Sequence, residues 1–220
     1  MIDTYPTTLG VIEIHVGSTD PYVVPWGAAR DDNFYQSSWT PCSMQDGLYD
    51  GFPPSTYESK FQARQAVPTD VTIDMAVFGG GVEWNVSATV CIEPTGNGKI
   101  MDVWMAQVID HYGPEYFDRN KVQDGSNGVE VSLAAGECAV VTETFQLNSV
   151  SAASPENVKF FAWAQDTELV WSQVMVYLGD PYYANTAEIY QAGKALAPFE
   201  GVFVGGFESG DLSGWSSTTP

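Results

Sequence analysis

Basic residues are scarce in this 220-residue chain, and that scarcity excludes several kinds of partner. Eight Lys and Arg residues stand against 28 Asp and Glu residues, which gives a formal net charge of −20 at pH 7. Nucleic acids and anionic membrane surfaces are bound through basic patches, so we expect neither as a partner. A high net negative charge is typical of a soluble protein. A more specific interpretation is that clustered carboxylates hold calcium or another hard cation.

Long apolar runs are also missing, and so is a targeting segment. No run of about 18 apolar residues occurs, so the sequence predicts no membrane span. Residues 1–4 show neither the charged nor the apolar region of a signal peptide. Frequent aromatic residues, with Ser, Thr, Asn and Gly at the polar positions, are typical of an extracellular β-rich protein. We therefore expect a secreted or outer-cell-surface protein whose export signal is not in this chain.

Cysteine is represented by only three residues, Cys42, Cys91 and Cys138, and no two of them form a Cys-x-x-Cys motif. No cluster of His residues accompanies them, so we expect neither a thiol redox pair nor a zinc site. Cys91 and Cys138 fall in predicted strands of one region, which makes them the preferred disulfide pair. Three free, half-buried thiols are the alternative that the sequence leaves open.

Catalytic motifs are absent as well. The chain has two His residues and no Gly-x-Ser-x-Gly sequence. No nucleophile is placed beside His15, so we interpret this residue as structural. The acidic clusters at 31–33, 46–50 and 118–124 lack the spacing of a calcium-binding loop. We therefore expect no enzyme, no catalytic residue and no cofactor, and we keep calcium only as the weaker alternative.

Residues 1–68 show the pattern of a mixed α/β region. Val11–Val16 is a short apolar run with β-branched residues, which predicts a buried parallel strand. A short helix is expected over Pro25–Arg30, where Pro occupies the first turn. Asp46-Gly47 predicts a hairpin turn, and a second helix is expected within residues 53–67.

Residues 69–179 change to a period of two, which is the pattern of antiparallel strands with one buried face. Val71–Val77 and Trp84–Ile92 both alternate apolar and small or polar residues, and a run of three Gly residues joins them. Residues 111–128 are expected to form a long polar loop. Seven short strands indicate an immunoglobulin-like β-sandwich. The further strands are expected near 99–109, 129–133, 138–147, 157–165 and 169–178.

Residues 180–220 are expected to form an extended tail. Residues 186–196 predict a weak helix, because Gly193 interrupts an otherwise helical pattern. Residues 199–207 have strong strand character instead, and they are suited to pair with an open sheet edge of another copy. The strand-exchange candidates are Phe199, Val202, Phe203, Val204 and Phe207.

The order of these elements, with the short motifs that mark them, resembles the 28-kilodalton outer-membrane protein family of secreted bacterial proteins. The resemblance covers roughly residues 8–178. Proteins of that family look like a thioredoxin-like half followed by an immunoglobulin-like sandwich. The matching segments are Ile14-His15-Val16 with Asp20-Pro21, Gly27-Ala28-Ala29-Arg30, Thr40-Pro41 with Asp46-Gly47, Arg64–Pro68 running into Val71–Asp74, and Ala164-Gln165-Asp166.

The resemblance implies a mixed α/β plus all-β fold. It places a partial thioredoxin-like region at residues 1–68, an immunoglobulin-like antiparallel sandwich at 69–179 and the extended tail at 180–220. The first strand, the Cys-x-x-Cys and the first helix of the thioredoxin-like half are missing, so we expect a family member truncated at its N-terminus. Thr40 and Pro41 take the place of the cis-proline that marks the thioredoxin-like fold.

Together these patterns favour a non-enzymatic, secreted or cell-surface bacterial protein that acts in binding or self-assembly. Its expected partners are other copies of itself or another surface protein, and strand exchange between copies would build a filament. Two alternatives come from other classes. One is an extracytoplasmic thiol–disulfide protein whose Cys-x-x-Cys lies upstream, and the other is a calcium-dependent adhesin.

Overall fold

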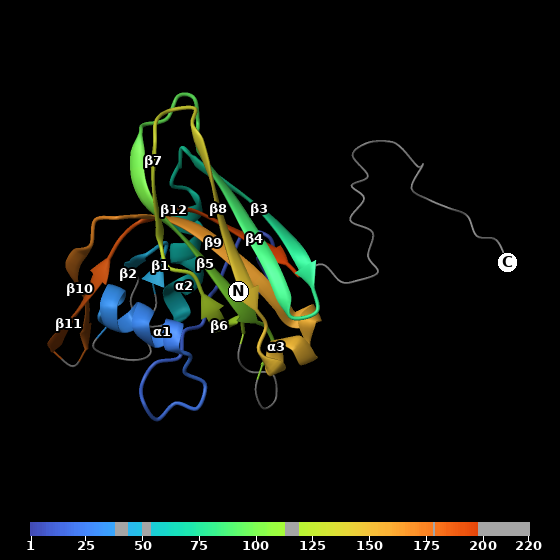
Figure 1. The fold of residues 1–220 in the computed structure, drawn as a ribbon. Helices are drawn as coiled ribbons and strands as arrows, with labels where there is room; N and C mark the ends of the chain where they lie inside the picture. Colours follow the sequence, from blue (N-terminus) through green and yellow to red (C-terminus); the bar gives the residue numbers. More distant parts are fainter. Residues whose placement is uncertain (38–43, 50–53, 113–118, 178, 198–220) are drawn as a thin grey trace.

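The computed structural model describes residues 1–37, 44–49, 54–112, 119–177 and 179–197. Antiparallel strands dominate the structure, and the helices are few and short (Figure 1). Two sheets enclose an apolar core, and a separate two-stranded hairpin is formed later in the chain. The antiparallel, β-rich architecture predicted for the middle of the chain is therefore confirmed.

The larger sheet has the strand order β12-β9-β5-β6, and the smaller sheet has the order β3-β4-β8. In the larger sheet, β7 pairs with the first half of β5 and β6 with its second half. The larger sheet contains β5 (Lys99–Ile109), β6 (Lys121–Gly125), β7 (Val129–Leu133), β9 (Val158–Asp166) and β12 (Ile189–Leu196). The smaller sheet contains β3 (Val71–Gly80), β4 (Glu83–Ile92) and β8 (Cys138–Gln146).

The period-two pattern decides which side chains enter the core. Every second residue of β4 is buried, while those between them are half-buried or exposed. Phe145 of β8 and Phe160 of β9 meet across the two sheets, with ring centroids 5.5 Å apart. Each large apolar side chain buried in this way stabilises the fold by about 1.5–3 kcal/mol. The buried residues of β4 are Trp84, Val86, Ala88, Val90 and Ile92.

The strand order matches the one that immunoglobulin-like sandwiches have, with β3-β4-β8 as strands A-B-E and β12-β9-β5 as strands G-F-C. The sequence placed the last strand of the sandwich at 169–178, and the structure differs. Residues Val170–Tyr177 form β10, which pairs with β11 (Asp180–Thr186) in the separate hairpin. The alternation of residues within β10 predicts a strand, but it does not show which other strand pairs with it.

The expectation of an extended tail from residue 180 is corrected by two strands. Residues 186–196, expected as a weak helix, contain β12, which pairs antiparallel with β9. The structure explains why glycine occupies position 193. A Cβ on Gly193 would lie 3.2 Å from Met75 of β3, so glycine permits the close approach of β12 to β3. The strand-exchange candidates lie outside the described residues, and they are Phe199, Val202, Phe203, Val204 and Phe207.

The long polar loop expected at 111–128 is interrupted by β6, which pairs with β5 and buries Val122. Helix α3 (Ser149–Ala153) follows β8, and the side chain of Asn148 caps it by accepting from two backbone N–H groups. A 3-10 turn, η4 (Pro155–Asn157), then leads into β9. Within the described residues, no helix is long and apolar enough to cross a membrane.

The N-terminal region does not show the expected thioredoxin-like arrangement in its described part. Val11–Val16, expected as a buried parallel strand, makes one parallel bridge, between Glu13 and Lys121 at the edge of β6. Ile12 and Ile14 from this segment pack against a second apolar cluster instead of a parallel sheet. The elements of this region are α1 (Pro25–Arg30), η1 (Asp31–Tyr35), β1 (Met44–Gln45), β2 (Leu48–Tyr49), η2 (Pro54–Thr56) and α2 (Tyr57–Gln65).

The Asp46-Gly47 turn is confirmed. Asp46 and Gly47 have φ values of 48° and 71°, the left-handed pair that a two-residue hairpin between β1 and β2 requires. The turn also fastens the N-terminal region to the sandwich, since Ile189 donates its backbone N–H to the Asp46 carbonyl at 2.7 Å. A Cβ on Gly47 would lie 1.9 Å from the Ala187 carbonyl oxygen, so only glycine fits.

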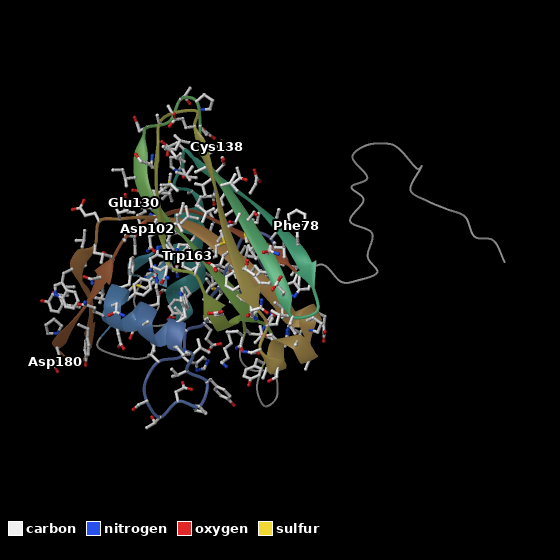
Figure 2. All side chains as sticks on the ribbon, in the orientation of Figure 1. Phe78, Asp102, Glu130, Cys138, Trp163 and Asp180 are labelled. Atoms are coloured by element: carbon white, nitrogen blue, oxygen red, sulfur yellow. A yellow bond between two sulfur atoms is a disulfide. The ribbon has the colours of Figure 1, made fainter. Side chains whose placement is uncertain are left out.

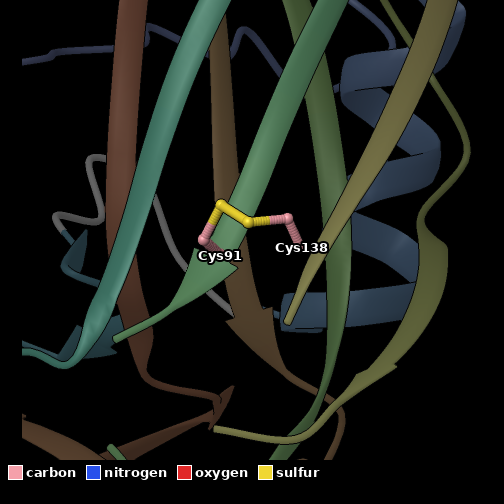
Figure 3. The surroundings of a disulfide bond; sticks show 2 residues. All are labelled: Cys91 and Cys138. Carbon is pink, nitrogen blue, oxygen red and sulfur yellow. A yellow bond between two sulfur atoms is a disulfide. The ribbon is translucent and has the colours of Figure 1, made fainter. Parts of the chain in front are cut away.

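A disulfide joins Cys91 of β4 to Cys138 of β8, the pair that the sequence favoured (Figure 3). The two residues lie directly opposite each other in the register of the two strands, with their Cα atoms 4.1 Å apart. Cys91 alternates with the buried residues of β4, so the disulfide lies on the outer face of the smaller sheet.

Candidate functional site

The β10–β11 hairpin is inserted between the last two strands of the larger sheet. The chain leaves β9 at Asp166, forms the hairpin and returns to the sheet at Ile189. Figure 1 shows β10 and β11 at the left of the view, to one side of the two sheets. Connections at the ends of an immunoglobulin-like sandwich are where such folds often place binding residues.

The hairpin presents an exposed aromatic pair. The rings of Trp171 on β10 and Tyr183 on β11 are nearly parallel, with an interplanar angle of 9° and centroids 6.0 Å apart. The register places both on one face of the hairpin, because Trp171 pairs with Asn185 and Gln173 pairs with Tyr183. Trp171 is 55% exposed and Tyr183 is 37% exposed. A contiguous patch of exposed apolar side chains is a feature that often marks an interaction site.

The strand that carries Trp171 has no charge. Residues 169–177 contain no Asp, Glu, Lys or Arg, although the chain has a net charge of −20. Leu169 and Val170 are also exposed, beside Trp171. Within the described residues, β11 is the only strand that pairs with β10, so the outer edge of β10 is unpaired. Sheet edges of this kind usually have charged residues that prevent association with another chain.

Polar contacts hold the hairpin in place against the rest of the molecule. The side-chain amide of Asn185 donates to the backbone carbonyl of Phe34 at 2.7 Å. The Thr186 hydroxyl donates to the Val170 carbonyl at 3.1 Å, which closes the base of the hairpin. Ala184, which precedes both residues on β11, is fully buried. The aromatic pair is therefore presented on an ordered surface.

A second notable site lies beneath the hairpin, where Arg30 is enclosed by aromatic rings. Its guanidinium carbon is 3.6 Å from the ring centroid of Phe34 and 3.8 Å from that of Trp104. Tyr35 and Trp163 lie further out, at 5.1 and 5.9 Å. Arg30 ends helix α1, so a turn of helix positions it over the larger sheet. Burial lowers the pKa of the Arg30 guanidinium, and the nearby Tyr35 opposes that shift.

Gln165 connects this arginine to the sandwich. Its side-chain oxygen accepts from Nη2 of Arg30 and, at 3.3 Å, from the indole N–H of Trp163. Its side-chain nitrogen donates to the Ala187 carbonyl at 2.9 Å. Gln165 is fully buried, so these contacts are made away from water. One amide therefore joins helix α1, strand β9 and the connection between β11 and β12.

A charged cluster lies around Asp110 at the end of β5. The carboxylate of Asp110 accepts from Nε of Arg119 and from Nζ of Lys159, both at 2.6 Å. Arg119 also binds the carboxylate of Asp3, which ties the start of the chain to this cluster. Burial alone would raise the pKa of the Asp110 carboxyl, but the hydrogen bonds from Arg119 and Lys159 outweigh it and hold the pKa well below its usual range.

The Asp110 cluster predicts a pH-dependent stability. Because the folded-state pKa lies below the unfolded value of about 3.9, the contribution is complete above that value and is lost as pH falls through the folded pKa. Asp110→Asn is expected to lower the free energy of unfolding by about 1–3 kcal/mol at pH 7. The difference should begin to shrink below about pH 4, where Asp110 binds a proton in the unfolded chain while it is still ionised in the folded protein, and it should continue to shrink as pH falls toward the folded-state pKa. Urea unfolding at several pH values measures it, and an unchanged difference at acidic pH would contradict the assignment.

The site residues predicted from the sequence differ in whether the structure describes them and brings them together. Cys91 and Cys138 are brought together, whereas the Thr40–Pro41 pair lies outside the described residues. Nδ1 of His15 lies 2.9 Å from the carboxylate of Asp20, which orients the ring. Among the described residues, no group of three or more His, Cys, Asp or Glu side chains is arranged to hold a metal ion.

Sequence reasoning missed both aromatic sites. Trp171 was expected in a strand of the sandwich, but its partner Tyr183 was assigned to the tail. Nothing in the sequence therefore indicated that the two rings lie together. The one available hint was the uncharged run at 169–177 in a strongly acidic chain. Arg30 was noted only as part of a short motif, and its contacts with Trp104 and Gln165 join residues far apart in the sequence.

The comparisons with known proteins are limited to structure. No protein-family model matches the sequence, and no curated protein matches it. The chain is similar to HBP35 of Porphyromonas gingivalis, with a TM-score of 0.54 and 12% identity over 76% of this chain and 55% of that one. The matched part is therefore little more than half of the HBP35 chain. This likeness concerns the fold alone.

Weaker likenesses link the chain to β-glucosidases. The enzyme of Kluyveromyces marxianus matches with a TM-score of 0.27 and 8% identity, over 58% of this chain and 14% of that one. The GH3 β-glucosidase of Bifidobacterium adolescentis matches with a TM-score of 0.26 and 17% identity, over 61% and 19%. At such scores these likenesses do not bear on the function of this chain.

Proposed function

We propose that this chain is a non-enzymatic bacterial protein, secreted or on the outer cell surface, that acts in self-assembly through its β10–β11 hairpin. The observation that supports it is the exposed, parallel pair of Trp171 and Tyr183 on an uncharged strand beside the sandwich. The disulfide and the acidic composition support a place outside the cytoplasm.

The chemistry of the hairpin favours a second copy of the chain as its partner. A basic partner would find no acidic side chain on residues 169–177, although acidic residues are plentiful elsewhere in the chain. An identical uncharged edge is complementary to itself, because backbone N–H and C=O groups of two antiparallel strands pair across a two-fold axis. The β10 edges of two copies would then form one continuous sheet.

The side chains at the edge supply the affinity. Trp and Tyr are the residue types that most often dominate the free energy of a protein interface, and exposed Leu169 and Val170 extend the apolar area. Two copies of the chain, each with a net charge of −20, repel each other through the surface outside the interface. Screening by salt weakens that repulsion, so association is expected to strengthen as salt rises toward about 0.15 M, where the Debye length is about 8 Å.

Sedimentation equilibrium over a range of protein concentrations tests the proposal. Wild type is expected to associate reversibly, and Trp171→Lys is expected to sediment as a monomer, because it places a charge at the centre of the interface. Phe78→Lys is the matched control, since Phe78 is also an exposed aromatic residue on a strand, 64% exposed. Figure 2 shows Phe78 on the opposite side of the view from Asp180, the first residue of β11.

Two results would overturn the proposal. One is a wild-type protein that remains monomeric at all concentrations and salt levels. The other is association that Trp171→Lys and Phe78→Lys leave equally unchanged. In that second case, a variant lacking 198–220 tests strand exchange through 199–207, the alternative route to assembly. Loss of association in that variant alone would assign assembly to strand exchange in place of the hairpin.

A further inference from the structure

We propose that the cavity lined by Arg30 binds a small monocarboxylate with an apolar body, and that the carboxylate accepts from an unpaired N–H group of the Arg30 guanidinium. This site is distinct from the exposed face of the β10–β11 hairpin, and the inference does not depend on self-assembly. It is drawn from a buried cation with unused hydrogen-bond donors beside a cavity with apolar walls.

The donors of Arg30 are only partly used. Arg30 is 3% exposed, yet its Nε and Nη1 atoms have no hydrogen-bond acceptor among the described residues. Nη2 donates to the side-chain oxygen of Gln165, and Tyr35 also interacts with the guanidinium. Phe34 and Trp104 lie over the guanidinium, and Nε and Nη1 are themselves closed to solvent, so a ligand in the cavity reaches an unpaired N–H group only as the side chains around it shift. Buried N–H groups without acceptors are strongly unfavourable, and an anionic acceptor relieves both the missing bonds and the unpaired charge.

The cavity gives a ligand room to reach that edge. It has a volume of 1670 Å³, and Arg30 is one of its lining residues. Trp26, Phe161, Trp163 and Ile189 line the same cavity and give it apolar walls. Sites for small molecules typically occupy about 300–1,000 Å³ and combine apolar walls with a few polar groups. We therefore expect a ligand with an apolar body and one polar group at its end.

The charge of that polar group follows from the other cations around the cavity. Arg64 is paired with two carboxylates, Lys99 with one, and Arg119 with that of Asp3. Lys194 donates to two backbone carbonyls of the N-terminal segment. Within the described residues, Arg30 and Lys194 are thus the two lining cations without a carboxylate at ion-pair distance, and Asp102 is near enough to Arg30 to interact with its charge. Of the two, only Arg30 is deeply buried and keeps N–H groups without an acceptor, so we assign the single carboxylate to Arg30. A planar carboxylate is also the group that matches the N–H edge of a guanidinium.

The acidity of the whole chain adds a kinetic consequence. A net charge of −20 repels an approaching anion at long range, whereas the buried contact with Arg30 is screened much less. Binding of a carboxylate is therefore expected to become faster and tighter as salt rises from low to physiological levels. An anion held by exposed surface lysines would show the opposite salt dependence.

Phenylacetate is a suitable probe, and phenylacetamide is its neutral control of almost equal shape. The measurement is an NMR titration of the ¹⁵N-labelled full chain, read at the arginine Nε–H signals. The chain contains three arginines, Arg30, Arg64 and Arg119, so the signals are few. Arg64→Lys and Arg119→Lys identify two of them, which leaves the third to Arg30. Phenylacetate is expected to move the Arg30 Nε–H signal downfield in a saturable way, and phenylacetamide is expected to bind about tenfold more weakly or less.

Substitution of Arg30 provides the second readout. Arg30→Lys keeps the charge but loses the planar edge, so phenylacetate is expected to bind about tenfold more weakly to it. Lys159→Arg, a charge-conserving change at a paired cation outside the cavity lining, is the control and should leave the affinity unchanged. If Arg30→Lys does not fold, the wild-type titration still decides. An Arg30 signal that does not move with phenylacetate, or that moves equally with phenylacetamide, would overturn the proposal.

Discussion

Replacing Gln165 by Leu is expected to lower the free energy of unfolding by about 3–5 kcal/mol. The substitution removes the acceptor of Arg30 and Trp163, and it also removes the donor to the Ala187 carbonyl. Three buried polar groups would lose their partner at once, and one of them is a charged guanidinium that already has two N–H groups without an acceptor. Urea unfolding measures the effect as a fall in the midpoint at an unchanged slope.

The matched control is Gln146→Leu, the same substitution on the exposed face of β8. Gln146 donates to Glu83 at 2.8 Å, but both side chains are exposed, so water replaces the lost bond. Its effect is expected to stay within about 0.5 kcal/mol. Equal effects of the two substitutions would show that the Gln165 contacts do not connect helix α1 to the sandwich.

Removing the Cys91–Cys138 disulfide is the second large effect that we expect. The bond joins residues 47 positions apart, and opening it restores conformational freedom to the unfolded chain. For a loop of this length, the loss of stability is expected to be about 2–4 kcal/mol. The measurement is urea unfolding of the Cys91→Ser, Cys138→Ser double variant under non-oxidising conditions, compared with oxidised wild type.

Reduced wild type is the internal control for the disulfide. It should unfold at the same urea concentration as the double variant, because both lack the same cross-link. Non-reducing peptide mapping of wild type should recover one peptide pair linked through Cys91 and Cys138. Two free thiols at these positions, or a double variant as stable as oxidised wild type, would contradict the pairing.

The sequence was most informative where structure is local. The alternation over β3 and β4 predicted both strands, because one buried and one solvated face leave a period-two pattern that needs no knowledge of the partner strand. The Asp46-Gly47 turn was predictable for the same reason, since few residues adopt two successive left-handed conformations. The antiparallel strands from β3 to β9 were accordingly predicted, with the exception of β6, which lies in a segment expected to be a loop.

Pairings between distant segments were not predictable from one sequence. The strands β10 and β12 both alternate, and nothing local shows that β12 pairs with β9 while β10 pairs with β11. Gly193 made the helix predicted over β12 a weak one, but it did not indicate a strand. The need for glycine at this position comes from the nearby Met75 of β3, which is distant in the sequence. The candidate sites share this property: the Trp171–Tyr183 pair and the Arg30–Gln165 contact exist only after the chain has folded.

Hydrogen–deuterium exchange of the full chain at low and high protein concentration tests self-assembly through the hairpin most directly. The backbone N–H groups of β10 that point away from β11 are open to solvent in a single copy and become bonded when two copies pair. We predict that protection of Val170–Tyr177 rises with concentration in wild type but not in Trp171→Lys, while protection of Val71–Gly80 stays constant. Protection of Val170–Tyr177 that does not change with concentration would contradict the account.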